Sequence, residues 1–208
     1  ILDIGGGDGS IARHLASYPS VVKIDVVDPV KNKNRAKHKK IKYIKMRAED
    51  ISKLNRKKKY DLIIMLNLIE HVTDPKNVMQ NLKKLLFKGG LCLIKTPNTK
   101  SLNFRLFKKI YWGGYHSPRH FNLFNYENIK LICKNYRISD IKFTQGVPQW
   151  HATLVAIFIK LNIFKSKTPI HLRLELIPVM IIFGLIDLIF LKFFKLTDQF
   201  FLVLELNN

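Results

Sequence analysis

Acidic residues and cysteines are scarce in this sequence. Its 208 residues include 15 Asp and Glu against 36 Lys and Arg, and two cysteines, Cys92 and Cys133. Both cysteines stand in apolar stretches without a Cys-x-x-Cys spacing. We therefore expect neither a disulfide framework nor a thiolate metal site, and interpret them as core residues in a reducing compartment. Hydrophobic residues make up 47%, which excludes a disordered or fibrous chain.

The shortage of acids leaves a formal net charge of +21. Such an excess is typical of proteins that bind nucleic acids. Lys far outnumbers Arg, however, and Ile and Asn are also abundant, a pattern that a biased genome produces as well. Residues 31–59 hold 14 of the 36 basic residues. We interpret them as a solvated basic face, with an anionic membrane surface as the alternative, and do not expect a nucleic-acid partner.

The chain also lacks an initiator methionine and a signal peptide. It opens at Ile1 inside an apolar run that reads as a buried strand. We therefore expect an N-terminally truncated sequence from a cytoplasmic protein, associated with the inner face of the membrane if its apolar tail contacts lipid.

Apolar runs alternate with helix-length polar stretches, which is typical of an α/β fold with a parallel sheet. Right-handed crossovers then favour a Rossmann-like, doubly wound sheet. The third expected helix is the best marked, with Asp74 as its cap, Pro75 at its first position and Gly89 as its stop. The expected strands are 1–4, 21–28, 41–46, 60–66 and 91–96, and the expected helices are 9–17, 30–39 and 75–87.

The pattern changes after Pro97. We expect loops over 98–124, a helix over 125–135, a sixth strand over 138–146 and a final strand over 200–206. This organisation predicts three segments: a cofactor-binding domain over 1–146, an apolar helical insertion over 147–197, and a last strand within 198–208 that returns to the sheet.

A glycine-rich turn follows the first strand. Glycines permit a tight bend and a close approach to a ligand, and the helix that follows offers free N–H groups at its N-terminus. Asp28 ends the second strand about 20 residues later, where a carboxylate can accept both hydroxyls of an adenosine ribose. A plain turn and a helix-capping Asp are the alternatives. The turn consists of Asp3, Gly5, Gly6, Gly7, Asp8 and Gly9.

The glycine spacing disfavours a nicotinamide dinucleotide. The pattern G-x-G-x-x-G/A, started at Gly5, requires Gly or Ala at position 10, where Ser10 stands. Started at Gly6, it meets Asp8 at the second glycine.

Four sequence blocks in order resemble the class I S-adenosylmethionine-dependent methyltransferases, in a branch that includes the ubiquinone-biosynthesis O-methyltransferases. The blocks are Ile1–Gly9, Tyr60–Pro75, Leu85–Asn98 and Ser117–Phe124. The resemblance covers about residues 1–146. It implies a seven-stranded sheet in the order 3-2-1-4-5-7-6 with the last strand antiparallel, and S-adenosylmethionine as cofactor.

The resemblance also implies site residues. Gly5 and Gly7 approach the amino-acid portion of the cofactor, Asp28 holds its ribose, and Leu66 and Asn67 line the sulfonium side. Arg47 departs from the pattern, because many members have there an Asp that contacts the adenine. We expect this contact from one of three neighbours: Ala48, Glu49 or Asp50.

The expected reaction is methyl transfer, as O-methylation, to a small acceptor that is lipid-linked or associated with the cell envelope. An RNA methyltransferase and a non-catalytic membrane- or partner-binding module are the alternatives. A hydroxyl acceptor needs a base, and His71, His116 and His120 are the candidates, with structural hydrogen bonds as the competing reading. We expect no metal site, because Glu70, His71 and His120 lack a ligand-type spacing.

Two apolar stretches, 152–164 and 170–196, precede the final strand. A single membrane crossing would leave that strand on the far side, and the first stretch is too short to supply a second crossing. We therefore expect an interfacial or re-entrant helix pair that contacts a membrane peripherally through 152–196, with its lysines near the headgroups. A lid over the acceptor, a dimer interface and true spanning are the alternatives. The sequence does not predict the oligomeric state.

Overall fold

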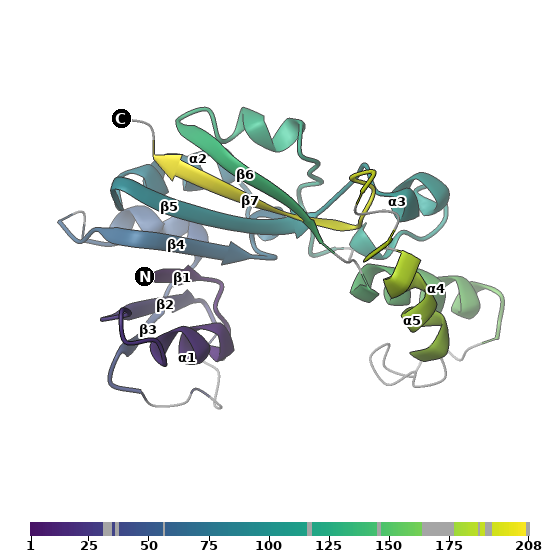
Figure 1. Cartoon of the computed structure of the whole chain (residues 1–208), viewed down its shortest axis with the longest axis horizontal. Coiled ribbons are helices and arrows are strands. Elements are labelled where there is room, and N and C mark those ends of the chain that lie inside the picture. Colours follow the sequence, from purple (N-terminus) through teal and green to yellow (C-terminus); the bar gives the residue numbers. More distant parts are fainter. Residues whose placement is uncertain are drawn as a thin grey trace. The chain divides into compact units, whose positions relative to one another are not determined.

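The computed structural model describes residues 1–30, 35, 38–55, 57–115, 118–144, 147–163, 177–186, 188–189 and 193–206. Seven strands form one mixed sheet in the order β3-β2-β1-β4-β5-β7-β6, with β7 antiparallel to its neighbours (Figure 1). The sheet predicted from the resemblance is therefore confirmed. The strands are β1 Leu2–Ile4, β2 Ile24–Asp28, β3 Ile41–Lys45, β4 Tyr60–Leu66, β5 Leu86–Pro97, β6 Tyr136–Thr144 and β7 Gln199–Leu206.

The register of the central strands brings their carboxyl ends to one edge. Ile4 pairs with Val27 of β2 and with Met65 of β4, both in parallel. The residues one position further along, Gly5, Asp28 and Leu66, therefore leave the sheet at the same level. An open parallel sheet binds its ligands at this edge.

The first unit of the structure contains most of the parallel sheet. It comprises Ile1–Thr96, Glu127–Ile141 and Leu202–Asn208. β1 is buried along its whole length, as expected for a central parallel strand. The helix α1 (Ser10–Ala16) packs Ala12 and Ala16 against Ile24 and Val26 of β2.

The helix predicted over 75–87 is shorter in the structure. The helix α2 covers Pro75–Lys83, and Asp74 caps it by accepting a hydrogen bond from the Asn77 N–H at 2.9 Å. Gly89 does not stop this helix, because it lies inside β5 with φ +74°. β5 advances from Leu86 to Leu91 while β4 advances from Tyr60 to Leu62, so Gly89 sits in a bulge.

Other predicted elements also differ from the structure. Only a short 3₁₀ turn, η4 (Asn128–Leu131), forms in the segment 125–135, where we expected a helix. The segment 98–124, expected to be loop, holds the helix α3 (Leu102–Phe107) and the 3₁₀ turn η3 (Gly113–Tyr115). Two further 3₁₀ turns are η1 (Ala48–Lys53) and η2 (Ile69–His71). Most of the predicted helix 30–39 lies outside the described residues.

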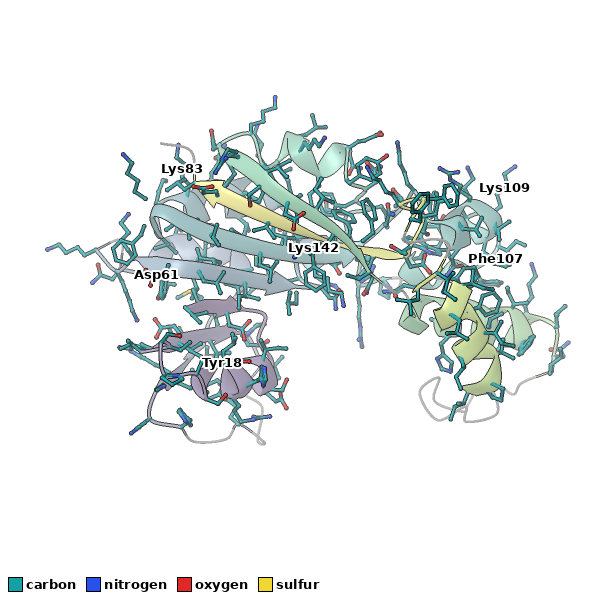
Figure 2. All side chains as sticks on the ribbon, viewed as in Figure 1. Tyr18, Asp61, Lys83, Phe107, Lys109 and Lys142 are labelled. Atoms are coloured by element: carbon teal, nitrogen blue, oxygen red, sulfur yellow. The ribbon has the colours of Figure 1, made fainter. Side chains whose placement is uncertain are left out.

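The second unit comprises Pro97–Tyr126 and Lys142–Phe201. Its helices α4 (Val147–Lys160) and α5 (Ile177–Ile186) pack on each other, and the Phe183 ring stacks on Trp150 at 4.4 Å between centroids. Phe107, labelled in Figure 2, meets Trp150 edge to face at 6.3 Å. The predicted domain limits at 146 and 197 remain predictions.

A buried polar network holds this second unit together. Asp198 is fully buried and accepts hydrogen bonds from the Asn103 amide (2.7 Å) and the Trp112 indole N–H (3.3 Å). The Thr153 hydroxyl donates a hydrogen bond to Asn103 Oδ1 at 3.1 Å. It also accepts a hydrogen bond from the Gly113 N–H at 2.8 Å. Asp198, in the segment before β7, is therefore joined to α3 and to Trp112 directly before η3. Thr153 connects α4 to the same network.

Among the described residues, no helix is long and apolar enough to cross a membrane.

Candidate functional site

The glycine turn after β1 has a backbone that only glycine adopts easily. Gly5, Gly7 and Gly9 have φ values of +75°, +54° and +80°. The Gly5 N–H donates to the Val27 carbonyl at 2.7 Å, and the Gly9 N–H donates to the Gly6 carbonyl at 2.8 Å. The turn is thus tied to β2 on one side and closed on itself on the other.

Asp28 connects the end of β2 to this turn. Its Oδ2 accepts a hydrogen bond from the Gly7 N–H at 3.0 Å, and its Oδ1 accepts one from the Val30 N–H at 2.8 Å. A carboxylate offers about four acceptor positions, so it can still accept hydrogen bonds from a ribose. The structure therefore brings together the two features that predicted an adenosine cofactor.

Asp3 is the buried acid of the site. Its side chain is 3% exposed, and its Oδ2 has no hydrogen-bond partner among the described residues. Burial, and then the negative charge of Asp28, raises the pKa of Asp3 to about 6. A buried carboxyl oxygen without a partner is costly, which indicates a site that a cationic or hydrogen-bonding ligand completes.

The space around the glycines of the turn shows where a ligand fits. A Cβ at Gly7 would meet no atom within 4 Å, so open space lies over this position. A Cβ at Gly6 would lie 2.5 Å from Asp3 Oδ2, and one at Gly9 would lie 2.2 Å from the Tyr43 hydroxyl. Gly6 and Gly9 are thus required by the protein's own packing, whereas Gly7 faces space that a cofactor can use.

The predicted adenine-side residues lie in η1. Ala48 is buried. Glu49 binds Arg47 (3.5 Å) and accepts a hydrogen bond from the Thr73 N–H (3.3 Å). Asp50 forms an ion pair with Lys53 at 2.6 Å. Glu49 and Asp50 are thus already engaged by the chain, and which of the three contacts the adenine stays a prediction.

The end of β4 adds a strained residue to the same edge. Leu66 is the last residue of the strand, and Asn67 follows with φ +51°, a value that few residues other than Gly and Asn adopt. The Asn67 N–H donates to the Lys95 carbonyl at 2.9 Å, which fixes this turn against β5. Leu68 reaches back toward the glycine turn, because a Cβ at Gly5 would lie 3.0 Å from it.

Glu70, which the sequence analysis weighed only as a member of a rejected metal set, is a buried carboxyl group. It is 1% exposed, its Oε2 accepts a hydrogen bond from the Thr96 hydroxyl at 3.0 Å, and its Oε1 has no hydrogen-bond partner among the described residues. Burial raises the pKa of Glu70 to about 7, against the opposing effect of hydrogen bonds from its own N–H and Thr96. The sequence signal was weak, because a Glu next to a His in the sequence is normally interpreted as a surface residue.

The predicted base candidates with a described position belong to different units: His71 to the first and His120 to the second. His71 ends η2, and its N–H donates to the Leu68 carbonyl at 2.8 Å. His120 belongs to the second unit, where its Nδ1 donates to the Gly114 carbonyl at 2.6 Å, so Nε2 carries the lone pair of the neutral ring. His116 lies outside the described residues.

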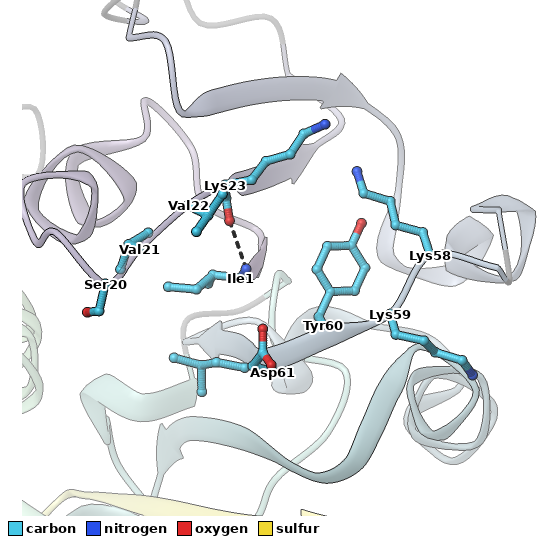
Figure 3. A pocket seen from close by; sticks show the side chains of 10 residues that line it. Ile1, Ser20, Val21, Val22, Lys23, Lys58, Lys59, Tyr60 and Asp61 are labelled. Atoms are coloured by element: carbon cyan, nitrogen blue, oxygen red, sulfur yellow. Dashed lines mark hydrogen bonds between the residues drawn. The ribbon is translucent and has the colours of Figure 1, made fainter.

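A pocket of about 400 Å³ opens at the other end of the strands (Figure 3). Ile1, Lys23, Lys58, Tyr60 and Asp61 are among its lining residues, at the amino ends of β1, β2 and β4. This edge lies opposite the glycine turn, so the pocket is not the cofactor site.

A buried acid stands beside this pocket. Asp25 is fully buried, and its Oδ2 accepts hydrogen bonds from Lys58 and, at 2.6 Å, from the Tyr60 hydroxyl. Burial acts to raise the pKa of Asp25, but these hydrogen bonds and the Lys58 charge bring it below its usual value. Asp25 is therefore a structural anchor between β2 and β4.

Comparison with known proteins identifies the family of the chain. Residues 1–136 match the family model described as a methyltransferase domain. The ubiquinone biosynthesis O-methyltransferase of Glaesserella parasuis is 29% identical over 106 residues, which are 47% of this chain and 45% of that protein. The one of Rickettsia bellii is 34% identical over 103 residues, 47% of this chain and 42% of that protein. The chain spans less than half the length of these relatives.

Solved structures share the fold over almost the whole chain. A SAM-dependent methyltransferase from Archaeoglobus fulgidus aligns with 98% of this chain and 84% of its own, with a TM-score of 0.60 and 17% sequence identity. Because the sequence identity is this low, the similarity shows a shared fold and nothing beyond it.

Proposed function

The chain belongs to the methyltransferase domain family, as a class I S-adenosylmethionine-dependent member, and from this premise we propose that it transfers a methyl group to an oxygen of a small, lipid-linked acceptor. The hydrogen bond between Asp28 and the Gly7 N–H carries this proposal. It joins the ribose-binding carboxylate to the one glycine of the turn that faces open space.

Each group at this edge has a role in binding. When bound, S-adenosylmethionine supplies an activated methyl group, because its sulfonium sulfur leaves as a neutral thioether. Asp28 would accept hydrogen bonds from the ribose hydroxyls, and Asp3 would offer a buried carboxylate to the positively charged part of the ligand. The Asn67 turn borders the reacting side from β4. These residues hold the ligand and exclude water, and such positioning supplies up to about 7–11 kcal/mol in well-oriented systems.

A hydroxyl acceptor has to lose its proton as the new C–O bond forms. His71 is our candidate for the proton acceptor on the first unit, because η2 follows β4 on the edge that carries the glycine turn. His120 is the candidate on the second unit, since its Nδ1–H is held by the Gly114 carbonyl and Nε2 is then the basic nitrogen.

Two observations support the acceptor class. The relatives that match residues of this chain are named O-methyltransferases, which favours an oxygen atom. The second unit exposes large apolar side chains, among them Leu106, Ile110 and Phe121, which favour an acceptor with an apolar portion.

A transfer assay tests the proposal. The full-length protein is incubated with methyl-labelled S-adenosylmethionine and an extract of its source cells, which is then partitioned between organic and aqueous phases. With S-adenosylmethionine near its wild-type dissociation constant, we expect label in the organic phase with the wild type and at least tenfold less with Asp28→Ala. Label confined to the aqueous phase would contradict a lipid-linked acceptor, and absence of label in both phases would contradict the activity.

The same assay tests the two bases. We expect His71→Ala and His120→Ala to lower the turnover number at least tenfold while the dissociation constant of S-adenosylmethionine, measured by calorimetry, changes less than twofold. Unchanged turnover in both variants would remove them from the mechanism.

A further inference from the structure

The helix α5 has an unusual surface for a helix of a water-soluble domain. None of its ten residues carries a charged or polar side chain. A helix that is apolar all round is normally buried on every side. Here five residues are exposed: Ile177 by 45%, Ile181 and Ile182 by 57% each, Leu185 by 50% and Ile186 by 38%.

The exposed residues occupy one side of the helix. Ile177, Ile181 and Leu185 follow each other at a spacing of four, and Ile182 and Ile186 form the adjacent row at the same spacing. Phe183 points the other way, where its ring stacks on Trp150 of α4 with an angle of 13° between the planes. α5 is therefore attached to α4 by one side and presents a purely aliphatic side outward.

The residues after α5 continue this apolar character. Leu188 and Ile189 are exposed by 49% and 75%, and Phe193 and Phe194 by 81% and 52%. An isolated exposed apolar residue needs no explanation, but a cluster of this size marks an interaction surface. We call this set the apolar face; it consists of Ile177, Ile181, Ile182, Leu185, Ile186, Leu188, Ile189, Phe193 and Phe194.

Among the described residues, the surface charges of the second unit are all positive, while Glu175 and Asp187 lie outside them. Its segments 97–126 and 142–201 contain twelve Lys or Arg and three Asp or Glu. Among its described residues the sole acid is Asp198, which is buried in the polar network. Lys160 and Lys195 are exposed near the two ends of the apolar segments, and Lys109 extends from the end of α3 (Figure 2).

We propose that the apolar face inserts into the headgroup–acyl boundary of an anionic lipid bilayer, with α5 lying in the plane of the membrane. Aliphatic and Phe side chains bury themselves at that depth, while the long lysine side chains reach the anionic headgroups. A ten-residue helix spans about 15 Å, half of a bilayer core, so it suits an interfacial position.

The same charges argue against a second copy of the chain as the occupant of this face. Two second units brought face to face would bring like charges together without an exposed acid among the described residues to pair with them. Anionic lipids supply the missing negative charge, at about 1 kcal/mol for each basic residue near the surface.

Vesicle flotation tests the proposal with the full chain. The probes are vesicles of phosphatidylcholine alone and of phosphatidylcholine with about one third phosphatidylglycerol. We expect wild-type protein to float with the anionic vesicles and at least tenfold less with the neutral ones. The variant Ile182→Asn should weaken the partition about tenfold, because it removes half-exposed aliphatic surface from the insertion. Leu131→Asn is the matched control, since Leu131 is 63% exposed on η4 of the first unit.

A fluorescent label reports insertion directly. Cys92 and Cys133 are buried, so a cysteine introduced as Ile181→Cys is the accessible site for an environment-sensitive dye. Anionic vesicles should raise its emission several-fold and shift it to the blue, whereas the dye on Leu131→Cys should not respond. Binding to S-adenosylmethionine, measured in parallel, confirms that each variant is folded.

Three outcomes would overturn the proposal. They are equal flotation of wild type and Ile182→Asn, no flotation with anionic vesicles, and a dye at position 181 that stays polar with lipid. Analytical ultracentrifugation without lipid tests the alternative occupant. If the wild type forms a dimer that Ile182→Asn dissociates, the apolar face binds a second copy of the chain instead. The inference does not rest on the methyl acceptor, because lipid binding is measured without methyl transfer.

Discussion

Buried carboxyl groups distinguish the two units of the protein. In the first unit, Asp3 and Glu70 lie at the carboxyl edge of the sheet, and each keeps one oxygen without a hydrogen-bond partner among the described residues. In the second unit, Asp198 is equally buried, but Asn103 and Trp112 donate to its two oxygens. A buried acid with both oxygens satisfied indicates architecture, whereas an unsatisfied oxygen at the carboxyl edge indicates a site that a ligand completes. Asp25 also keeps one oxygen without a partner among the described residues, but it lies at the opposite edge and is anchored by Lys58 and Tyr60.

The largest effect is expected where the acid is satisfied. Asp198→Ala leaves the Asn103 amide and the Trp112 indole buried without their acceptor, so we expect the free energy of unfolding to fall by about 3–5 kcal/mol. Urea unfolding followed by tryptophan fluorescence measures this loss. Asp198→Asn, which retains one acceptor oxygen, should lose less. A change below about 1 kcal/mol in Asp198→Ala would show that the network does not hold the second unit together.

The second prediction concerns the carboxylate that joins β2 to the glycine turn. Asp28→Ala removes the acceptor for the ribose and the hydrogen bond to Gly7, so we expect affinity for S-adenosylmethionine to fall by about 30- to 100-fold. Calorimetry measures it. Asp61→Ala, at the opposite edge of the sheet, is the control and should bind normally. Equal affinity of the two variants would separate Asp28 from the cofactor.

The third prediction follows from the raised pKa of Glu70. Burial favours its protonated form in the folded state, with a pKa of about 7 against an ordinary 4.5. The folded protein then binds one proton more than the unfolded chain between these values, so its stability falls as pH rises from 4.5 to 7. Glu70→Gln removes this dependence, and we expect it to be about 3 kcal/mol more stable than the wild type at pH 8.

Chemical unfolding at pH 4.5 and pH 8 measures this difference. At pH 4.5 the difference should shrink to below about 0.5 kcal/mol, because Glu70 is then protonated in the folded state and half protonated in the unfolded chain. A wild-type stability that is independent of pH would show that Glu70 is solvated or paired.

The smallest effect is expected for Asp3. Its pKa of about 6 means that it loses its charge in mildly acidic solution, whereas S-adenosylmethionine is positively charged. We therefore expect wild-type affinity to fall about tenfold between pH 7.5 and pH 5, one unit below the pKa. In Asp3→Asn the affinity should be lower at pH 7.5 and should change little with pH. The same slope in both proteins would exclude Asp3 as the titrating group.

The sheet and the cofactor edge were predictable because their signals are local. Four buried strands coincide with apolar runs of the sequence. Gly5 and Gly7 come directly after the first of these strands, and Asp28 ends the second. The extent of α2 was not predictable, because Leu85 and Leu86 continue the apolar pattern of the helix, whereas in the structure both are buried and Leu86 begins β5. The bulge at Gly89 was missed for a related reason: a glycine after a helix usually ends it, and only the pairing of β5 with β4 reveals the extra residues.

The sequence by itself determined the glycine turn and the acid at the end of β2, because backbone freedom and strand periodicity act over a few residues. It determined the family through the resemblance of four motif blocks. Tertiary structure decided which carboxyl groups lack a partner. Asp198 finds its donors 95 and 86 residues away, at Asn103 and Trp112. Glu70 of η2 accepts a hydrogen bond from Thr96 of β5, 26 residues further along the chain. It also decided which side of α5 stays exposed, since an all-apolar helix carries no pattern that marks its outer face, and only the stacking of Phe183 on Trp150 selects it.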